Sequence, residues 1–310
     1  MPSEIASSFH QWVKTIQDQI CDELSQIDGA RFKEDEWSRS GGGGGQSRIL
    51  SNGSVFEKAG VNVSEVFGPV STEMAPMFKQ MCDSQGVRMP ESDAAFYATG
   101  VSLVVHPRNP FVPTTHANFR YFELKGADSE PIWWVGGGAD MTPYYLFEED
   151  ARDFHLALKG ALDRLDPQYY PRFKAQCDQY FYLPHRQEAR GIGGIFYDYL
   201  NQHSPDHYLQ MHQGCAAAFS DVYGRIVRKR MHMSVTEANR HWQQVRRGRY
   251  VEFNLIYDRG TLFGLKTNGR TESILMSLPP VCEWVYNQVP EPESPEGQLL
   301  ACLKAPRAWV

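Results

Sequence analysis

Polar side chains that could bind an anionic ligand stand in two neighbouring stretches of the chain. Side chains alternate faces along a strand, so His116, Asn118 and Arg120 point the same way. Ser102 and His106 share one face of the preceding stretch for the same reason. If the two strands pair, these groups line one surface, where the planar guanidinium matches a carboxylate and Asn and Ser supply neutral hydrogen bonds. The alternative is a solvated sheet face without a ligand.

Three glycines followed by an aspartate form the second unusual stretch, WWVGGGADMTPYY (133–145). Glycine lets a flat ligand approach the backbone closely. Asp140 follows them in an aromatic neighbourhood, where a carboxylate accepts hydrogen bonds from N–H groups or acts as a base. Spacing alone does not separate this role from an aspartate that caps the turn before Pro143.

Four histidines are candidate metal ligands: His106, His116, His155 and His185. None of them has the H-E-x-x-H spacing, and the sequence distances between them are long. Histidines that are buried or hydrogen-bonded without a metal are the alternative, and this alternative is favoured for at least two of the four.

A turn in the last third of the chain is a second candidate anion receptor. Asn268 and Gly269 tolerate positive φ, and such a turn presents backbone N–H groups together with the guanidinium of Arg270. The spacing alone favours an ordinary hairpin turn with a solvated arginine.

Apolar periodicity predicts the elements that must position these groups. Helical spacing of Phe9, Val13, Ile16 and Ile20 predicts an N-terminal helix. Further helices are expected over residues 147–165, 170–182, 206–231 and 235–246. Strands are expected over 96–105, 116–124, 131–135, 191–200 and 271–277, and a hairpin over 249–257 and 261–266. Glycines 41–45 are expected to form a mobile loop, because a phosphate cradle would need a Gly-Lys-Ser/Thr ending.

The predicted elements indicate one α+β domain over residues 1–310, with a mainly antiparallel sheet and helices on its faces. The chain is 42% hydrophobic, which is ample for a packed core. Its net charge of −6 gives no overall basic field for nucleic acid or an anionic membrane. Six cysteines without a C-x-x-C pair are typical of free thiols in a reducing cytoplasm. Without a signal peptide or a membrane span, the chain is expected to be cytoplasmic.

Four segments together resemble the oxygen-dependent coproporphyrinogen III oxidase family: NPFVPTTHANFRYFE, WWVGGGADMTPYY, FYLPHRQEARGIGGIFYDYL and RGRYVEFNLIYDRGTLFGLKTNGRTESILMSLPP. The resemblance runs from about Trp37 to Pro280. It implies a large, flat antiparallel sheet between helices and a homodimer formed through about residues 250–285. It also implies a reaction of haem biosynthesis, in which O2 converts two propionates of coproporphyrinogen III to vinyl groups. The products are protoporphyrinogen IX, CO2 and hydrogen peroxide.

The resemblance also implies roles for individual residues. Those that would bind substrate are Ser102, Asn118, Phe119, Arg120, Asn268, Gly269 and Arg270. His116 would donate a proton, and Asp140 would hold the pyrrole N–H groups. The family's proposed metal ligands correspond to the same four histidines, His106, His116, His155 and His185. Asn268 departs from the family, which commonly has glycine there.

The expected chemistry needs no organic cofactor, because the electron-rich macrocycle supplies electrons to O2 itself. This agrees with the lack of a Rossmann fingerprint or a haem-ligation motif. A divalent metal such as manganese stays open as a cofactor. Two other functions also stay open: an inactive tetrapyrrole carrier that uses the same sheet face, and a metal-dependent oxygenase built on the four histidines.

Overall fold

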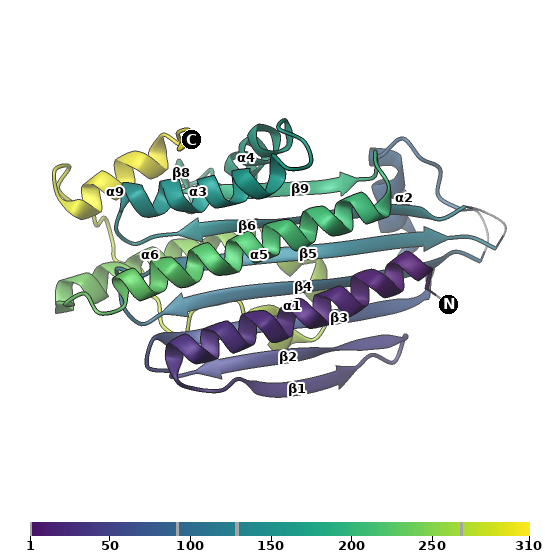
Figure 1. Ribbon diagram of the computed structural model, residues 1–310, viewed down its shortest axis with the longest axis horizontal. Helices are drawn as coiled ribbons and strands as arrows, with labels where there is room; N and C mark the ends of the chain where they lie inside the picture. Colours follow the sequence, from purple (N-terminus) through teal and green to yellow (C-terminus); the bar gives the residue numbers. More distant parts are fainter. Residues whose placement is uncertain (1, 91–92, 128–129, 267–268) are drawn as a thin grey trace.

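The sheet that carries the candidate residues is an antiparallel meander (Figure 1). The structure is a computed structural model that describes residues 2–90, 93–127, 130–266 and 269–310. Within these residues, seven strands pair in the order β1-β2-β3-β4-β5-β6-β9. They are β1 (Lys33–Ser38), β2 (Gly43–Ser51), β3 (Phe56–Pro69), β4 (Ala95–Pro107), β5 (Thr114–Lys125), β6 (Ile132–Thr142) and β9 (Gly193–Leu200). A small separate hairpin consists of β7 (Tyr182–Leu183) and β8 (Glu188–Ala189).

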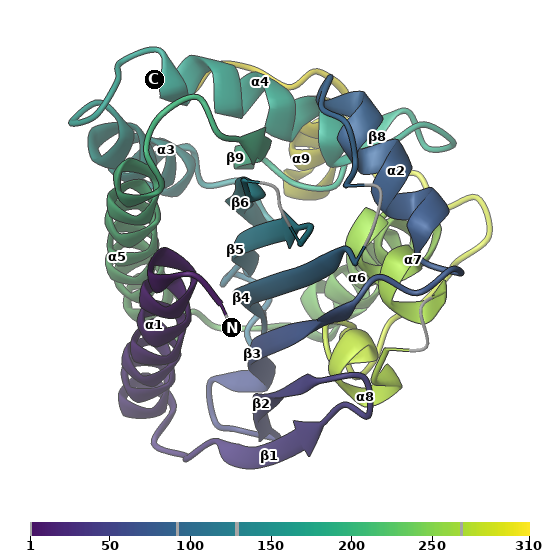
Figure 2. The same cartoon turned by 90° about the vertical axis from the view of Figure 1, so that its right-hand side faces the viewer.

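Helices cover both faces of this sheet (Figure 2). One face carries α1 (Glu4–Asp28), α3 (Glu148–Leu162) and α5 (Pro205–Arg230). The other carries α2 (Ala75–Ser84), α6 (Glu237–Ile256), α7 (Arg259–Lys266) and α8 (Thr271–Leu275). Two more helices, α4 (Tyr169–Tyr180) beside the edge strand β9 and α9 (Pro295–Lys304) near β8, complete the described part. The expected α+β class is therefore confirmed.

The main core lies between the sheet and the α1–α5 layer. Alternate residues of β4 and β5, such as Val101, Leu103 and Ala117, point into it and are at most 1% exposed. Phe9 and Val13 of α1 lie in the same cluster, as their helical spacing predicted. A fully buried side chain of this kind stabilises the fold by roughly 1.5–3 kcal/mol. The strand residues between them must point to the opposite face.

The predicted hairpin over 249–266 is wrong, because this segment forms the end of α6 and all of α7. Its aromatic and β-branched residues resemble a strand, yet Tyr250 and Phe253 are buried at helical spacing. Asp258 does not turn a hairpin. Its Oδ2 accepts a hydrogen bond from the backbone N–H of Thr261 at 2.7 Å, which is the role of a helix-capping aspartate.

Two further predictions are corrected. Residues 271–277 do not form a strand but the short helix α8, whose Ser273 carbonyl accepts a hydrogen bond from Asn62 Nδ2 at 2.9 Å. Three of the glycines expected in a mobile loop, 43–45, belong to β2. A Cβ on Gly45 would lie 2.5 Å from the ring of Trp37, so the indole occupies the space that a side chain would need.

The sequence predicts no membrane-spanning segment. Within the described ranges, none of the helices combines enough length with enough apolar character to cross a bilayer. All six cysteines are free thiols, and Cys21, Cys82, Cys177 and Cys215 are buried.

Candidate active site

The strand register brings the predicted polar residues onto one face. Ser102 pairs with Asn118 across β4 and β5, and Asn118 in turn pairs with Gly138 of β6. His116 and Arg120 follow Asn118 at alternate positions, on the face opposite α1 and α5. These four side chains, Ser102, His116, Asn118 and Arg120, are all partly exposed and are called the polar floor below. Alternation therefore predicted the shared face of these four residues, but His106, the fifth residue predicted with them, is fully buried and contacts the Ser277 carbonyl.

Arg120 lies across the first glycine of the glycine run. Its Nη2 is 2.9 Å from Asp198 Oδ1, and its Nη1 donates to Asn118 Oδ1 at 3.2 Å. A Cβ on Gly136 would lie 2.6 Å from the Asp198 carboxylate and 2.8 Å from Arg120 Nε. Glycine is therefore needed here for the ion pair itself. The Arg120 side chain is 40% exposed, so its guanidinium remains accessible to an anion.

A second arginine, which the sequence did not single out, stands beside this pair. Arg259 Nη2 is 3.6 Å from Asp198 Oδ2, and its guanidinium lies 4.9 Å from the ring centre of Tyr180. Two guanidinium groups thus share one carboxylate, and the cluster keeps a net positive charge. Such a cluster favours an anionic group.

Asp140 of β6 pairs with His116 across the strands and lies beside it on the same sheet face. Its carboxylate is 2% exposed and accepts two hydrogen bonds from Arg190 Nη2, at 2.9 Å and 2.8 Å, and one from His116 Nδ1 at 2.9 Å. Burial alone would raise the pKa of Asp140, but Arg190 and His116 outweigh it and hold the pKa below its ordinary value. Asp140 is therefore an ionised acceptor that fixes the His116 ring.

The second predicted anion receptor lies over the same face, towards the β1 edge. Arg270 Nη2 donates to Asp35 Oδ2 at 2.5 Å, and the backbone N–H of Gly269 donates to the Gly264 carbonyl at 2.8 Å. The helix α8 that follows is tied to Asn62, which pairs with Ser102 of the floor. Asn268 lies outside the described residues.

Phe119 does not reach the polar floor with its side chain. It is 1% exposed and points into the main core, with its ring centre 5.9 Å from that of Trp12 and 5.3 Å from that of His212. Because neighbouring strand residues face opposite ways, only its backbone lies between Asn118 and Arg120. A substrate contact by Phe119 is therefore limited to its peptide groups.

The four predicted metal ligands do not come together. His106 contacts Thr114 and the Ser277 carbonyl, His155 contacts Tyr170 and the Ile192 carbonyl, and His185 contacts Tyr257 and Glu252. His116 is bonded to Asp140. Across the ranges that the structure describes, no three His, Cys, Asp or Glu side chains are grouped to hold a metal. The expected four-histidine centre is corrected: each imidazole serves a different local hydrogen-bond network, and this donor set does not fit a shared ion.

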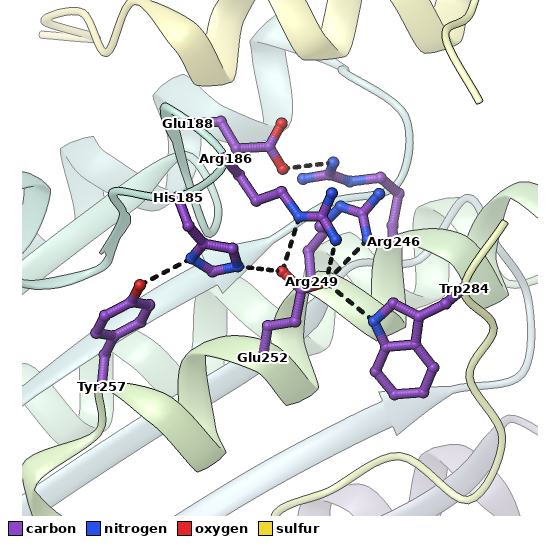
Figure 3. Close-up of polar contacts among 8 residues, drawn as sticks. All are labelled: His185, Arg186, Glu188, Arg246, Arg249, Glu252, Tyr257 and Trp284. Atoms are coloured by element: carbon purple, nitrogen blue, oxygen red, sulfur yellow. Dashed lines mark hydrogen bonds and ion pairs between the residues drawn. The ribbon is translucent and has the colours of Figure 1, made fainter. Parts of the chain in front are cut away.

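A dense ionic cluster ties the segment after β7 to α6 (Figure 3). Glu252 accepts hydrogen bonds from Arg186 at 2.9 and 2.6 Å, from His185 at 2.7 Å, from Arg249 at 3.1 Å and from Trp284 at 2.9 Å. This segment continues into Arg190, whose Nη1 donates to Asn254 Oδ1 of α6 at 3.0 Å. The segment from His185 to Arg190 is thereby fixed to α6.

The fold and the site define an α+β protein with a polar, arginine-containing face on an antiparallel sheet. The model of one family, "Coproporphyrinogen III oxidase", matches residues 8–309, so the chain belongs to that family. It is 49% identical to "Coproporphyrinogen-III oxidase 1, chloroplastic" of Arabidopsis thaliana, over 99% of this chain and 80% of the relative. It is 47% identical to "Oxygen-dependent coproporphyrinogen-III oxidase, chloroplastic" of Glycine max, with the same coverage of both chains.

Replacing Glu252 with Gln tests the ionic cluster. Burial raises the pKa of Glu252, but Arg186, His185 and Trp284 outweigh it and lower the pKa to about 2. A depressed pKa contributes stability above the ordinary value of 4.5, and that contribution is lost as the pH falls towards 2. We expect Glu252→Gln to lower the free energy of unfolding by about 3 kcal/mol at pH 7. The difference should shrink between about pH 5 and 3.

Urea unfolding at several pH values measures this difference. Glu73→Gln, at an exposed glutamate, is the control and should leave the pH dependence unchanged. A loss for Glu252→Gln that stays constant down to low pH would contradict the assignment.

Proposed function

We propose that this chain catalyses the oxygen-dependent conversion of coproporphyrinogen III to protoporphyrinogen IX in haem biosynthesis. Family membership and the printed names of the two relatives support this activity. Within the site, the supporting observation is that Arg120 and His116 lie on the same sheet face. Arg120 can bind a carboxylate, and His116 can transfer a proton. For each propionate, O2 accepts two electrons with one proton from the β-carbon and one from solution. The C–C bond to the carboxylate breaks, and a vinyl group, CO2 and hydrogen peroxide result.

The substrate's four carboxylates need cationic partners. Arg120 is placed to bind one of them while it stays close to Asp198, and Arg270 is the second partner, at the β1 side of the same face. Ser102 and Asn118 supply neutral hydrogen bonds between them. The remaining proposed contacts come from the backbone of Phe119, from Gly269 and from Asn268.

His116 is the proposed proton-transfer residue. An ionised carboxylate only accepts hydrogen bonds, so the Nδ1 that faces Asp140 carries a proton. The opposite nitrogen, Nε2, is then the atom that gives or takes a proton at the substrate. Asp140 acts through His116 in this arrangement. Its buried carboxylate, which Arg190 already occupies, is a poor direct partner for the pyrrole N–H groups.

O2 is the co-substrate, and the macrocycle supplies the electrons. No organic cofactor is assigned, and no step is assigned to a metal, because the four histidines do not form a common site. Metal analysis of a sample with measured turnover tests this assignment. Activity that falls in proportion to a removed ion would contradict it.

The homodimer and the cytoplasmic location are part of the proposal. Five exposed apolar side chains on or near residues 250–285 support an interface there: Leu255, Ile256, Leu265, Val281 and Trp284. A molar mass from light scattering equal to one chain would contradict the dimer.

The six free thiols support a reducing compartment, although both named relatives are chloroplastic. Fluorescence of a tagged chain in its own cells tests the location, and a signal confined to an organelle would contradict it.

Incubation with coproporphyrinogen III in air and without O2 tests the activity. We expect protoporphyrin, quantified after chemical oxidation of the product, in air only. Tight substrate binding without product in air would contradict the proposal and indicate a tetrapyrrole carrier.

Replacing Arg120 with Ala tests the substrate face. Hydrogen bonds to charged groups contribute about 1.5–3 kcal/mol, so kcat/KM should fall on the order of 10- to 100-fold, chiefly through a higher KM. Arg152→Ala, at an exposed arginine of α3, is the control. An unchanged KM in Arg120→Ala would remove this residue from the substrate site.

A further inference from the structure

Arg190 connects three separate parts of the fold at one buried point. It stands between β8 and β9, and its side chain is 2% exposed. Its Nη2 donates to both carboxylate oxygens of Asp140 on β6, and its Nη1 donates to Asn254 of α6. Arg190 lies in the segment FYLPHRQEARGIGGIFYDYL, but neither the spacing nor the resemblance assigned it a role.

Aromatic rings enclose the guanidinium. The Cζ atom of Arg190 lies 4.1 Å from the ring centre of Phe181, 4.6 Å from that of Tyr250 and 4.8 Å from that of Phe253. Cation–π contacts are strongest where water is excluded, so these rings hold the cation firmly. Phe181 also packs edge-on against His116, with 5.9 Å between the ring centres. The same ring therefore restrains both the guanidinium and the imidazole.

The arrangement determines which face of the carboxylate is available to His116. Arg190 occupies both oxygens from one side, and only Oδ1 also meets the imidazole Nδ1. Without Arg190, the Asp140 carboxylate would lose the only ion-pair partner besides His116 that it has among the described residues. Only the hydrogen bond to His116 would then hold the rotation of this carboxylate.

We infer that Arg190 is a positioning residue for the proposed reaction: through Asp140 it orients His116 so that Nε2 faces the polar floor. This inference rests on the proposed function. Arg190 itself touches no substrate, because its side chain is only 2% exposed and its guanidinium is enclosed by rings. Its loss should therefore lower kcat and leave KM within about threefold, since misplacement by about 1 Å can lower the rate on the order of 100-fold.

Chemical rescue separates positioning from general stability. Arg190→Ala removes the guanidinium and leaves a space between the three rings and the carboxylate. We expect kcat to fall about 100-fold and to recover in part when guanidinium ion is added at a non-denaturing concentration. Urea, which has a similar planar shape without the charge, should not restore it.

Arg246→Ala is the matched control. Arg246 is also a buried arginine of an ion pair, with its Nη1 2.7 Å from Glu188 Oε1 (Figure 3). Among the described residues, the hydrogen bonds of the Asp140 carboxylate come from Arg190 and His116 and not from Arg246. We expect its kcat to stay near that of the wild type in the folded fraction and not to respond to guanidinium. A near-normal kcat in Arg190→Ala, or a loss that guanidinium fails to restore while urea unfolding shows a folded chain, would overturn the inference.

A measurement on the unaltered protein covers the case in which Arg190→Ala does not fold. Nitrogen-15 NMR of labelled histidines reports which imidazole nitrogen of His116 carries the proton. A neutral ring protonated on Nδ1 supports the inference, and a ring protonated on Nε2 overturns it. If the wild type formed no product in air, the proposed function would be contradicted. The tautomer of His116 is measured independently of product formation, so the two failures can be distinguished.

Discussion

The buried pair between Arg190 and Asp140 is the interaction on which the arrangement of the site depends. Removing a charge from water costs several kcal/mol, and this is offset only when the partner geometry is good and the remaining polar atoms are bonded. Here two hydrogen bonds of 2.9 and 2.8 Å join the charges, Asn254 accepts a further N–H, and aromatic rings surround the cation, while the Nε–H of Arg190 is buried without a hydrogen-bond partner among the described residues. Three elements, β6, the segment after β8 and α6, therefore meet at a point beside His116. The imidazole has one orientation because the carboxylate next to it has one.

The antiparallel register is the second constraint, and it decides which side chains are available for chemistry. Along β4 and β5, alternate residues enter the core beneath α1 and α5, and the residues between them form the polar floor. A slip of one residue would exchange Phe119 with its polar neighbours and destroy both surfaces. Gly136 completes the arrangement, because the Arg120–Asp198 pair lies where its side chain would be. Packing and function thus share one register.

The sequence allowed the central strands, four of the five residues expected on the polar face and most helices to be predicted, because each depends on local periodicity. The region after residue 248 could not be read this way. Its strand-like composition follows from burial against the sheet, and the Asp258 that suggested a turn instead caps a helix. Two arginines were missed for a related reason, because their partners are distant in the sequence. Arg190 pairs with Asp140, and Arg259 pairs with Asp198. The four histidines are a different case: their residue type suits a metal, but each lies in its own hydrogen-bond network, which is the alternative favoured from the sequence for at least two of them.

A crystal structure with coproporphyrin III bound is the most direct test of the central claim. This oxidised form carries the same four carboxylates as the substrate and does not undergo the reaction. The account predicts the macrocycle on the sheet face that carries Ser102 and Asn118, with one carboxylate bonded to Arg120 and His116 Nε2 turned towards the ring. A macrocycle bound elsewhere, with the polar floor left empty and Arg120 engaged only by Asp198, would contradict it.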